Sequence, residues 1–171
     1  MSAELFRPVP LAKIGPAGLK IGITATEAEC AALAIRMGIP AVHELSCVFD
    51  LTPAKTDPAR IQAKGVLTAR VTRECIVSAE DFEMPAQDRF LVFFVPEGAE
   101  SEELDPDMED EIAYRGDTID LGEAAAEQLA LALDPYPRIE GAEMPDVGGA
   151  DDLSPFGALA RMRGKGKGKE G

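Results

Sequence analysis

The sequence is poor in aromatic residues, with no Trp, two Tyr and seven Phe. This scarcity argues against a large nucleic-acid platform that stacks bases on aromatic rings. No apolar run approaches the roughly 18 residues that a membrane-crossing helix needs. The first residues also lack the basic start and apolar stretch of a signal peptide. The sequence alone therefore predicts a soluble protein.

Residue types that bind metals or act as nucleophiles are also few. Cys30, Cys47 and Cys75 are an odd number without C-x-x-C spacing, which favours a reducing cytoplasm over a disulfide scaffold. Together with His43, the only histidine, they are too dispersed for a structural zinc site, which needs about four such ligands close together. A catalytic pair at His43 would need a Cys or Ser brought close by the fold, and we predict an ordinary sheet residue there instead.

Two short segments have a superficial likeness to ion-binding or phosphate-binding motifs. The acidic run 105–110 would need Gly at its sixth position to form a calcium loop, and Asp110 stands there. The segment 164–167 alternates Gly and Lys but lacks the strand before it and the helix after it that a phosphate loop requires. We therefore predict no cofactor, no metal and no catalytic residue, and a protein that is not an enzyme.

Acidic residues dominate the charge of the chain. They number 31 against 17 basic residues, which gives a formal net charge of −14. Nine of them fall within residues 97–111, where self-repulsion predicts a mobile loop. The first 160 residues carry a net charge of −18, because five basic residues lie from Arg161 onwards. Such an acidic body repels RNA and attracts basic proteins. The basic end could contact phosphate, fold back onto the acids, or only aid solubility.

Periodicity in the apolar residues predicts an α+β fold. Capping signals predict two helices, at 26–38 from Thr26 with Glu29 and at 121–133 from Asp120 with Glu123. Ala28, Ala32 and Ile35 are expected to supply the apolar face of the first helix, with Leu33 and Met37 as further candidates. Alternation of period two predicts an antiparallel sheet, open or curled towards a barrel, against which the helices pack. The strands are expected at 5–14, 19–24, 42–51, 60–73, 75–84 and 90–95.

The composition changes after residue 138. We predict a single domain over residues 1–138 and a flexible Gly/Pro/acidic linker over 139–153. A short amphipathic helix is expected at 154–163, opened by a Ser-Pro pair, and a disordered Gly/Lys tail at 164–171.

Two stretches resemble the signatures of one protein family. Cys75–Phe82, which reads Cys-Ile-Val-Ser-Ala-Glu-Asp-Phe, resembles the Cys-Val-Val-Thr-Leu-Glu-Pro-Phe segment of the YceD family. Gly116–Glu123, which reads Gly-Asp-Thr-Ile-Asp-Leu-Gly-Glu, resembles the second signature, together with Glu127–Leu129 and Leu131–Arg138. Ser154–Ala160 resembles the closing helix of that family. The order and spacing fit over roughly residues 5–162, particularly for the version found in alphaproteobacteria.

The resemblance implies a bacterial factor in ribosome biogenesis that is needed for the accumulation of large-subunit ribosomal RNA. It brings no catalytic residue. Some relatives have a cysteine cluster suited to zinc, but only Cys75 has a counterpart in this chain, so no metal-dependent feature is carried over.

These observations leave two binding functions open, while an RNA hydrolase has little support. The first is a cytoplasmic, non-enzymatic assembly factor that binds the large-subunit precursor, mainly through a basic protein on it. The second is an acidic module that sequesters a basic ribosomal protein or assembly factor off the ribosome. Gly116, Asp120 and Glu123 could instead serve only a turn and a helix cap. The candidate partner-binding residues are Arg70, Arg73, Glu80, Gly116, Asp120, Gly122, Glu123 and Glu127, and the candidate RNA contacts are Arg60, Lys64, Arg161, Arg163, Lys165, Lys167 and Lys169.

Overall fold

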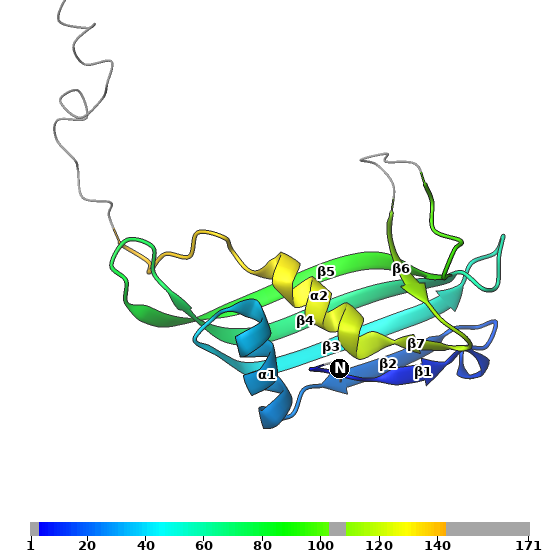
Figure 1. The fold of residues 1–171 in the computed structure, drawn as a ribbon, viewed down its shortest axis with the longest axis horizontal. Helices are drawn as coiled ribbons and strands as arrows, with labels where there is room; N and C mark the ends of the chain where they lie inside the picture. Colours follow the sequence, from blue (N-terminus) through cyan, green and yellow to red (C-terminus); the bar gives the residue numbers. More distant parts are fainter. Residues whose placement is uncertain (1–3, 103–108, 143–171) are drawn as a thin grey trace, which may run out of the picture. The chain divides into compact units, whose positions relative to one another are not determined.

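The computed structural model describes residues 4–102 and 109–142 (Figure 1). The chain divides into two units, Met1–Glu140 and Gly141–Gly171. The predicted helix at 154–163 and the Gly/Lys tail lie outside the described residues, and so does most of the predicted linker. The same holds for the candidate RNA contacts Arg161, Arg163, Lys165, Lys167 and Lys169.

A mixed five-stranded sheet forms the centre of the first unit, so the α+β class is confirmed. Its strands lie in the order β2-β3-β4-β5-β6, and β2 to β5 pair as antiparallel neighbours. A second sheet has two antiparallel strands, β1 and β7. The strands are β1 (Pro8–Pro10), β2 (Leu19–Thr24), β3 (Ala41–Pro53), β4 (Ile61–Glu74), β5 (Asp81–Pro96), β6 (Asp110–Tyr114) and β7 (Thr118–Asp120).

The sheet differs from the expectation in two respects. It is not purely antiparallel, because β6 pairs with β5 in parallel, from Val92 opposite Asp110 to Pro96 opposite Tyr114. A parallel neighbour requires a crossover connection of about a dozen residues or more, and the acidic run 97–109 supplies it. Nor does the sheet curl into a barrel, since the described strands leave β2 and β6 as two free edges.

Two segments predicted as strands form other structures. Cys75–Glu80 is the connection between β4 and β5, where Ala79 has a left-handed backbone with φ 59°. Leu5–Ile14 contains only the short strand β1, which is followed by a 3₁₀ turn at Leu11–Lys13. In both segments, local turn and cap geometry overrides the apolar alternation.

Both helices lie against the same face of the sheet (Figure 1). Helix α1 (Glu27–Met37) begins with the predicted capping box, in which Thr26 and Glu29 each accept a hydrogen bond from the backbone N–H of the other. Gly38 ends α1 in the left-handed conformation, with φ 64°. Helix α2 (Leu121–Ala132) is capped by Asp120. No helix among the described residues is long and apolar enough to span a membrane.

The buried face of α1 is only partly the predicted one. Leu33 is buried against β3, as predicted, and so are Cys30 and Ala34, whereas Ala28 is exposed and Ile35 is 84 % exposed. The helix is rich in alanine on several sides, so periodicity alone did not select a face. The larger Leu33 and the sulfur of Cys30 give better contacts with the sheet.

One hydrophobic core joins the helices to the sheet. In β4 the odd positions from Ile61 to Val71 are buried, as the alternation predicted. Gly65 occupies the centre of this row, and the ring of Phe90 on β5 lies across it. The absence of a side chain at Gly65 lets Phe90 meet Phe49 of β3 edge-on, with ring centroids 5.7 Å apart. The glycine therefore makes an aromatic contact across three strands possible.

Candidate functional site

The second signature, around Asp120, holds the N-terminal segment of the chain against α2. Asp120 Oδ1 accepts hydrogen bonds from the backbone N–H of Gly122 and of Arg7, each at 2.9 Å. The N–H of Leu121 donates to the carbonyl of Arg7 at 3.0 Å. Asp120 is therefore both a helix cap and a clamp on a segment more than a hundred residues away in sequence.

Gly122 is needed where two backbones approach closely. A Cβ atom at this position would lie 2.4 Å from the carbonyl oxygen of Leu5 and 3.0 Å from the nitrogen of Arg7. The side chain of Leu5 is completely buried beneath α2. Gly116 has a different requirement, because it has φ 69° in the turn between β6 and β7, where a Cβ atom would meet open space.

Glu123 joins the two helices to each other. Its carboxylate pairs with the guanidinium of Arg36 on α1 at 2.6 Å, and Arg36 also pairs with Glu4 at 3.1 Å. The hydrogen bonds that Arg36 donates to these carboxylates, above all to Glu123, raise the pKa of Arg36. Glu127 reaches solvent from the next turn of α2. Partial desolvation, and then the charge of Glu123, raise the pKa of the Glu127 carboxyl.

The first signature meets the end of the second. Cys75 opens the β4–β5 connection, and its Sγ accepts a hydrogen bond from the backbone N–H of Ile139 at 3.4 Å. Ile76 N–H donates to the carbonyl of Pro137 at 3.0 Å. Hydrogen bonds from Ser78 and then from Ile139 lower the pKa of the buried Cys75 thiol to about 7. The first signature thus forms a second clamp, which holds the segment after α2 against the β4–β5 connection.

Arg73 and Glu80 flank this clamp. Arg73 lies near the end of β4, and its Nη1 atom is buried without a hydrogen-bond partner among the described residues. Glu80 has an exposed side chain, and its carbonyl accepts the N–H of Cys75 at 2.8 Å.

Three of the candidate residues, Arg60, Lys64 and Arg70, lie in β4 or directly before it, and two of them are neutralised by ion pairs. Arg60 pairs with Glu111 at 2.5 Å and stacks over the ring of Phe93 at 4.3 Å. Arg70 bridges Glu83 of β5 at 2.7 Å and Glu44 of β3 at 3.2 Å. Lys64, between these two, has no ion pair in the described part of the chain and is exposed.

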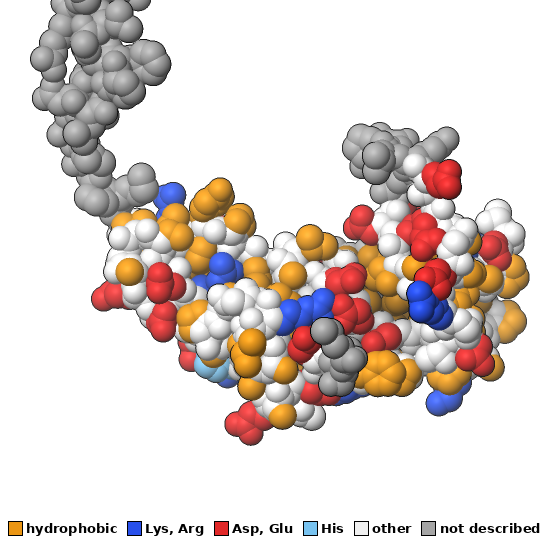
Figure 2. Space-filling model, viewed as in Figure 1, with side chains coloured by type: hydrophobic (Ala, Val, Ile, Leu, Met, Phe, Trp, Pro, Cys, Tyr) orange, Lys and Arg blue, Asp and Glu red, His pale blue; other side chains and the backbone are white. Residues whose placement is uncertain are grey.

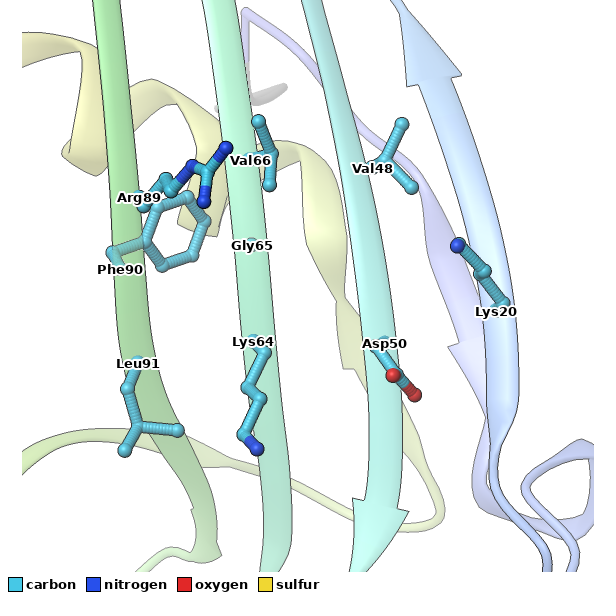
Figure 3. Close-up of a pocket in the computed structure, with 9 residues that line it drawn as sticks. All are labelled: Lys20, Val48, Asp50, Lys64, Gly65, Val66, Arg89, Phe90 and Leu91. Carbon is cyan, nitrogen blue, oxygen red and sulfur yellow. The ribbon is translucent and has the colours of Figure 1, made fainter.

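Two further cations join Lys64 on the sheet face that the helices leave free. Strand pairing aligns Lys20 of β2 and Lys64 of β4 on either side of Asp50, while Arg89 of β5 lies one row further along. Sequence reasoning missed Lys20 and Arg89, because each is a single cation in its own strand and only the register brings them together. These residues line a shallow hollow of about 500 Å³ (Figure 3).

Apolar and uncharged side chains complete this surface, which we call the open face. Val48, Val66 and Leu91 are 42 %, 47 % and 37 % exposed and lie among the cations. The neighbouring row across β2 to β5 is entirely neutral and consists of Thr24, Ser46, Thr68 and Gln87.

Acidic side chains gather around β6, the edge strand beside β5 (Figure 2). The ends of the acidic run 97–111 are structured, which differs from the predicted mobile loop. Glu97 pairs with Arg115 at 2.5 Å, and Glu111 lies within β6 and accepts the N–H of Ser101 at 2.8 Å. Residues 103–108 lie outside the described part.

His43 is a residue of β3, as predicted, and its side chain is exposed. Its Nε2 lies 2.7 Å from the hydroxyl of Thr72 and 3.6 Å from the carboxylate of Glu83. Within residues 4–102 and 109–142, no group of three or more His, Cys, Asp or Glu side chains could hold a metal ion.

Comparison with known proteins yields one match. The family model described as "Large ribosomal RNA subunit accumulation protein YceD" matches residues 63–161, which is more than half of the chain and includes both signatures. No curated protein and no solved structure matches the chain. Since the matched residues make up more than half of the chain, the chain belongs to the YceD family, the proteins named for the accumulation of large-subunit ribosomal RNA.

Proposed function

We propose that this protein is a non-enzymatic ribosome biogenesis factor that binds a precursor of the large ribosomal subunit in the cytoplasm. The observation that carries the proposal is membership of a family named for large-subunit RNA accumulation. The order and spacing of the motifs support assignment to the alphaproteobacterial version of that family. The three free cysteines fit a reducing compartment.

The charge of the chain favours a basic protein as the main contact on the precursor. With a net charge of −14, the molecule as a whole gains little from counterion release on RNA. Acidic surfaces steer basic proteins towards them and can shield those proteins from premature contact with RNA. We therefore assign the acidic run 97–111 as the surface for a basic ribosomal protein or assembly factor.

The test is sedimentation of the tagged protein from gently lysed cells at low salt, before and after ribonuclease. Migration with immature large-subunit particles, lost after ribonuclease, is the expected result. A light complex that is indifferent to ribonuclease would contradict it and would support the second candidate, sequestration of a basic protein off the ribosome.

A variant of the acidic run separates the two candidates. Glu102, Glu103, Asp105 and Asp107 are changed to Gln or Asn, while Glu97 and Glu111 stay, because they hold Arg115 and Arg60. The control neutralises an equal number of exposed acids elsewhere, among them Glu74 and Asp81. Loss of the basic partner with particle association intact favours sequestration. Loss of particle association in the first variant alone favours the assembly factor.

A further inference from the structure

We propose that the open face of the sheet binds RNA through phosphate groups of its backbone, with Lys20, Lys64 and Arg89 as the contacts. The inference deepens the proposed function. It rests on that function for the identity of the RNA, which we take to be RNA of the large ribosomal subunit. It assigns a specific surface to RNA in a chain whose net charge is otherwise unfavourable for such contact.

The three cations of the open face have no carboxylate partner among the described residues, unlike most arginines of the fold. Arg7, Arg36, Arg60, Arg70 and Arg115 each pair with one or more carboxylates. Lys20, Lys64 and Arg89 form no ion pair with any described residue, although the chain is rich in acids. The only acid among the residues that line the hollow is Asp50. The centre of the open face therefore has a local excess of two positive charges.

The two ends of the face are closed by internal pairs. Arg60, stacked on Phe93 and paired with Glu111, closes one end, and Arg70, bridging Glu44 and Glu83, closes the other. The three free cations lie between these ends on β2, β4 and β5 (Figure 3). Since neighbouring strands lie about 4.8 Å apart, the cations span about 14 Å across the sheet. This width is enough for several successive phosphates.

The other side chains of the face suit a sugar–phosphate backbone. The row Thr24, Ser46, Thr68 and Gln87 offers hydroxyl and amide donors for phosphate oxygens and for ribose hydroxyl groups. Val48, Val66 and Leu91 offer apolar contact to ribose carbons. No aromatic side chain is among the exposed ones there, because the ring of Phe90 lies across Gly65 towards Phe49. The face therefore lacks the stacking platforms that hold bases.

Acids border the open face at one edge of the sheet. Asp110 and Glu111 lie in β6 beside β5, and Glu111 pairs with Arg60 at that end of the face. These acids repel RNA from the β6 edge, so we expect phosphates to lie nearer to Lys20, Lys64 and Arg89. The acidic run 97–111 remains the proposed contact for a basic protein. An acidic protein on the open face would also satisfy the cations, and the experiment below distinguishes it from RNA.

The experiment measures the binding of a short fluorescently labelled RNA hairpin to the full chain by anisotropy. Three phosphate contacts predict a slope of log K against log salt of about −2 to −3. The variant Lys20→Gln/Lys64→Gln should reduce the size of this slope by about 2 and weaken binding at least about tenfold at low salt. The control Lys13→Gln/Lys55→Gln changes the net charge equally at exposed positions off the open face and should bind like wild type.

Equal weakening in both double variants, or no binding of the hairpin by wild type, would overturn the proposal. So would particle association that the Lys20/Lys64 variant loses but ribonuclease does not disturb, because the face would then hold a protein. All four substitutions lie on exposed side chains, and circular dichroism verifies that both variants fold. If the variants behave as expected but removal of the protein leaves large-subunit RNA levels unchanged in cells, the RNA face stands and the proposed function fails.

Discussion

Replacing Gly122 by alanine tests whether the second signature is structural. The new Cβ would lie 2.4 Å from the Leu5 carbonyl oxygen and 2.7 Å from its carbon, both backbone atoms that cannot rotate away. The N-terminal segment must therefore leave α2, or α2 must shift. Neither helix packing nor sheet pairing offers an alternative site for that segment in the described fold.

The size of the effect follows from what the segment contributes. Its release breaks the hydrogen bonds from Arg7 N to Asp120 and from Leu121 N to the Arg7 carbonyl, each worth about 1 kcal/mol. Exposure of the fully buried Leu5 side chain costs about 2 kcal/mol more. The higher helix propensity of alanine returns about 1 kcal/mol. Gly122→Ala should therefore lower the free energy of unfolding by about 3 kcal/mol.

Urea unfolding followed by far-ultraviolet circular dichroism is the assay, since the chain has no Trp for fluorescence. The matched control is Gly22→Ala on β2, where the nearest atom to the new Cβ is Val48 Cγ2 at 3.9 Å. That variant should stay within about 0.5 kcal/mol of wild type.

A double variant refines the test. Leu5→Ala alone should cost about 2–4 kcal/mol, but little more in the Gly122→Ala background, where the segment has already been released. Additive costs, or a Gly122→Ala protein as stable as wild type, would refute the clamp. Wild-type stability combined with loss of particle association would instead mark Gly122 as a partner contact.

Three further substitutions probe contacts elsewhere in the fold. Gly65→Ala places a Cβ 2.0 Å from Phe90 Cζ and should cost about 2 kcal/mol in urea unfolding, and adding Phe90→Leu should recover part of the loss. Glu29→Gln should cost about 1–2 kcal/mol at pH 7. Because Arg7 lowers the pKa of Glu29 from 4.5 to about 2, this contribution is present above pH 4.5 and should vanish as the pH falls towards 2. A constant difference across that pH range would contradict the assignment. Cys75→Ala removes the acceptor of Ile139 N–H and should cost about 1 kcal/mol and speed hydrogen exchange at that amide, and unchanged exchange would exclude this bond.

Local signals in the sequence predicted the elements that depend on local physics. The capping residues Thr26 and Asp120 fixed both helix starts, because a cap satisfies backbone groups only a few residues away. The alternation along β4 predicted its buried row from Ile61 to Val71, because a period of two always separates the faces of a strand.

Features that depend on distant contacts were not predictable in the same way. The parallel pairing of β6 depends on where the chain returns to the sheet after the acidic run, and no residue pattern in that run predicts the point of return. Lys20 and Arg89 meet Lys64 only through the registers of three strand pairs. Gly122 was recognisable as part of a motif, but its reason, the approach of Leu5, involves residues at opposite ends of the first unit.

The parallel edge strand β6 also has a consequence for solubility. It is short and is joined to β5 through the crossover 97–109 rather than a tight turn, so its detachment leaves the antiparallel strands β2 to β5 intact. Such opening would uncover the edge of β5 along Val92–Val95, an apolar stretch that could template pairing with another chain. Glu97 directly follows β5, and Asp110 and Glu111 of β6 pair with Val92 and Phe93, so carboxylates lie beside this edge. These carboxylates oppose aggregation through the β5 edge, since two chains that approached edge to edge would bring their like charges together.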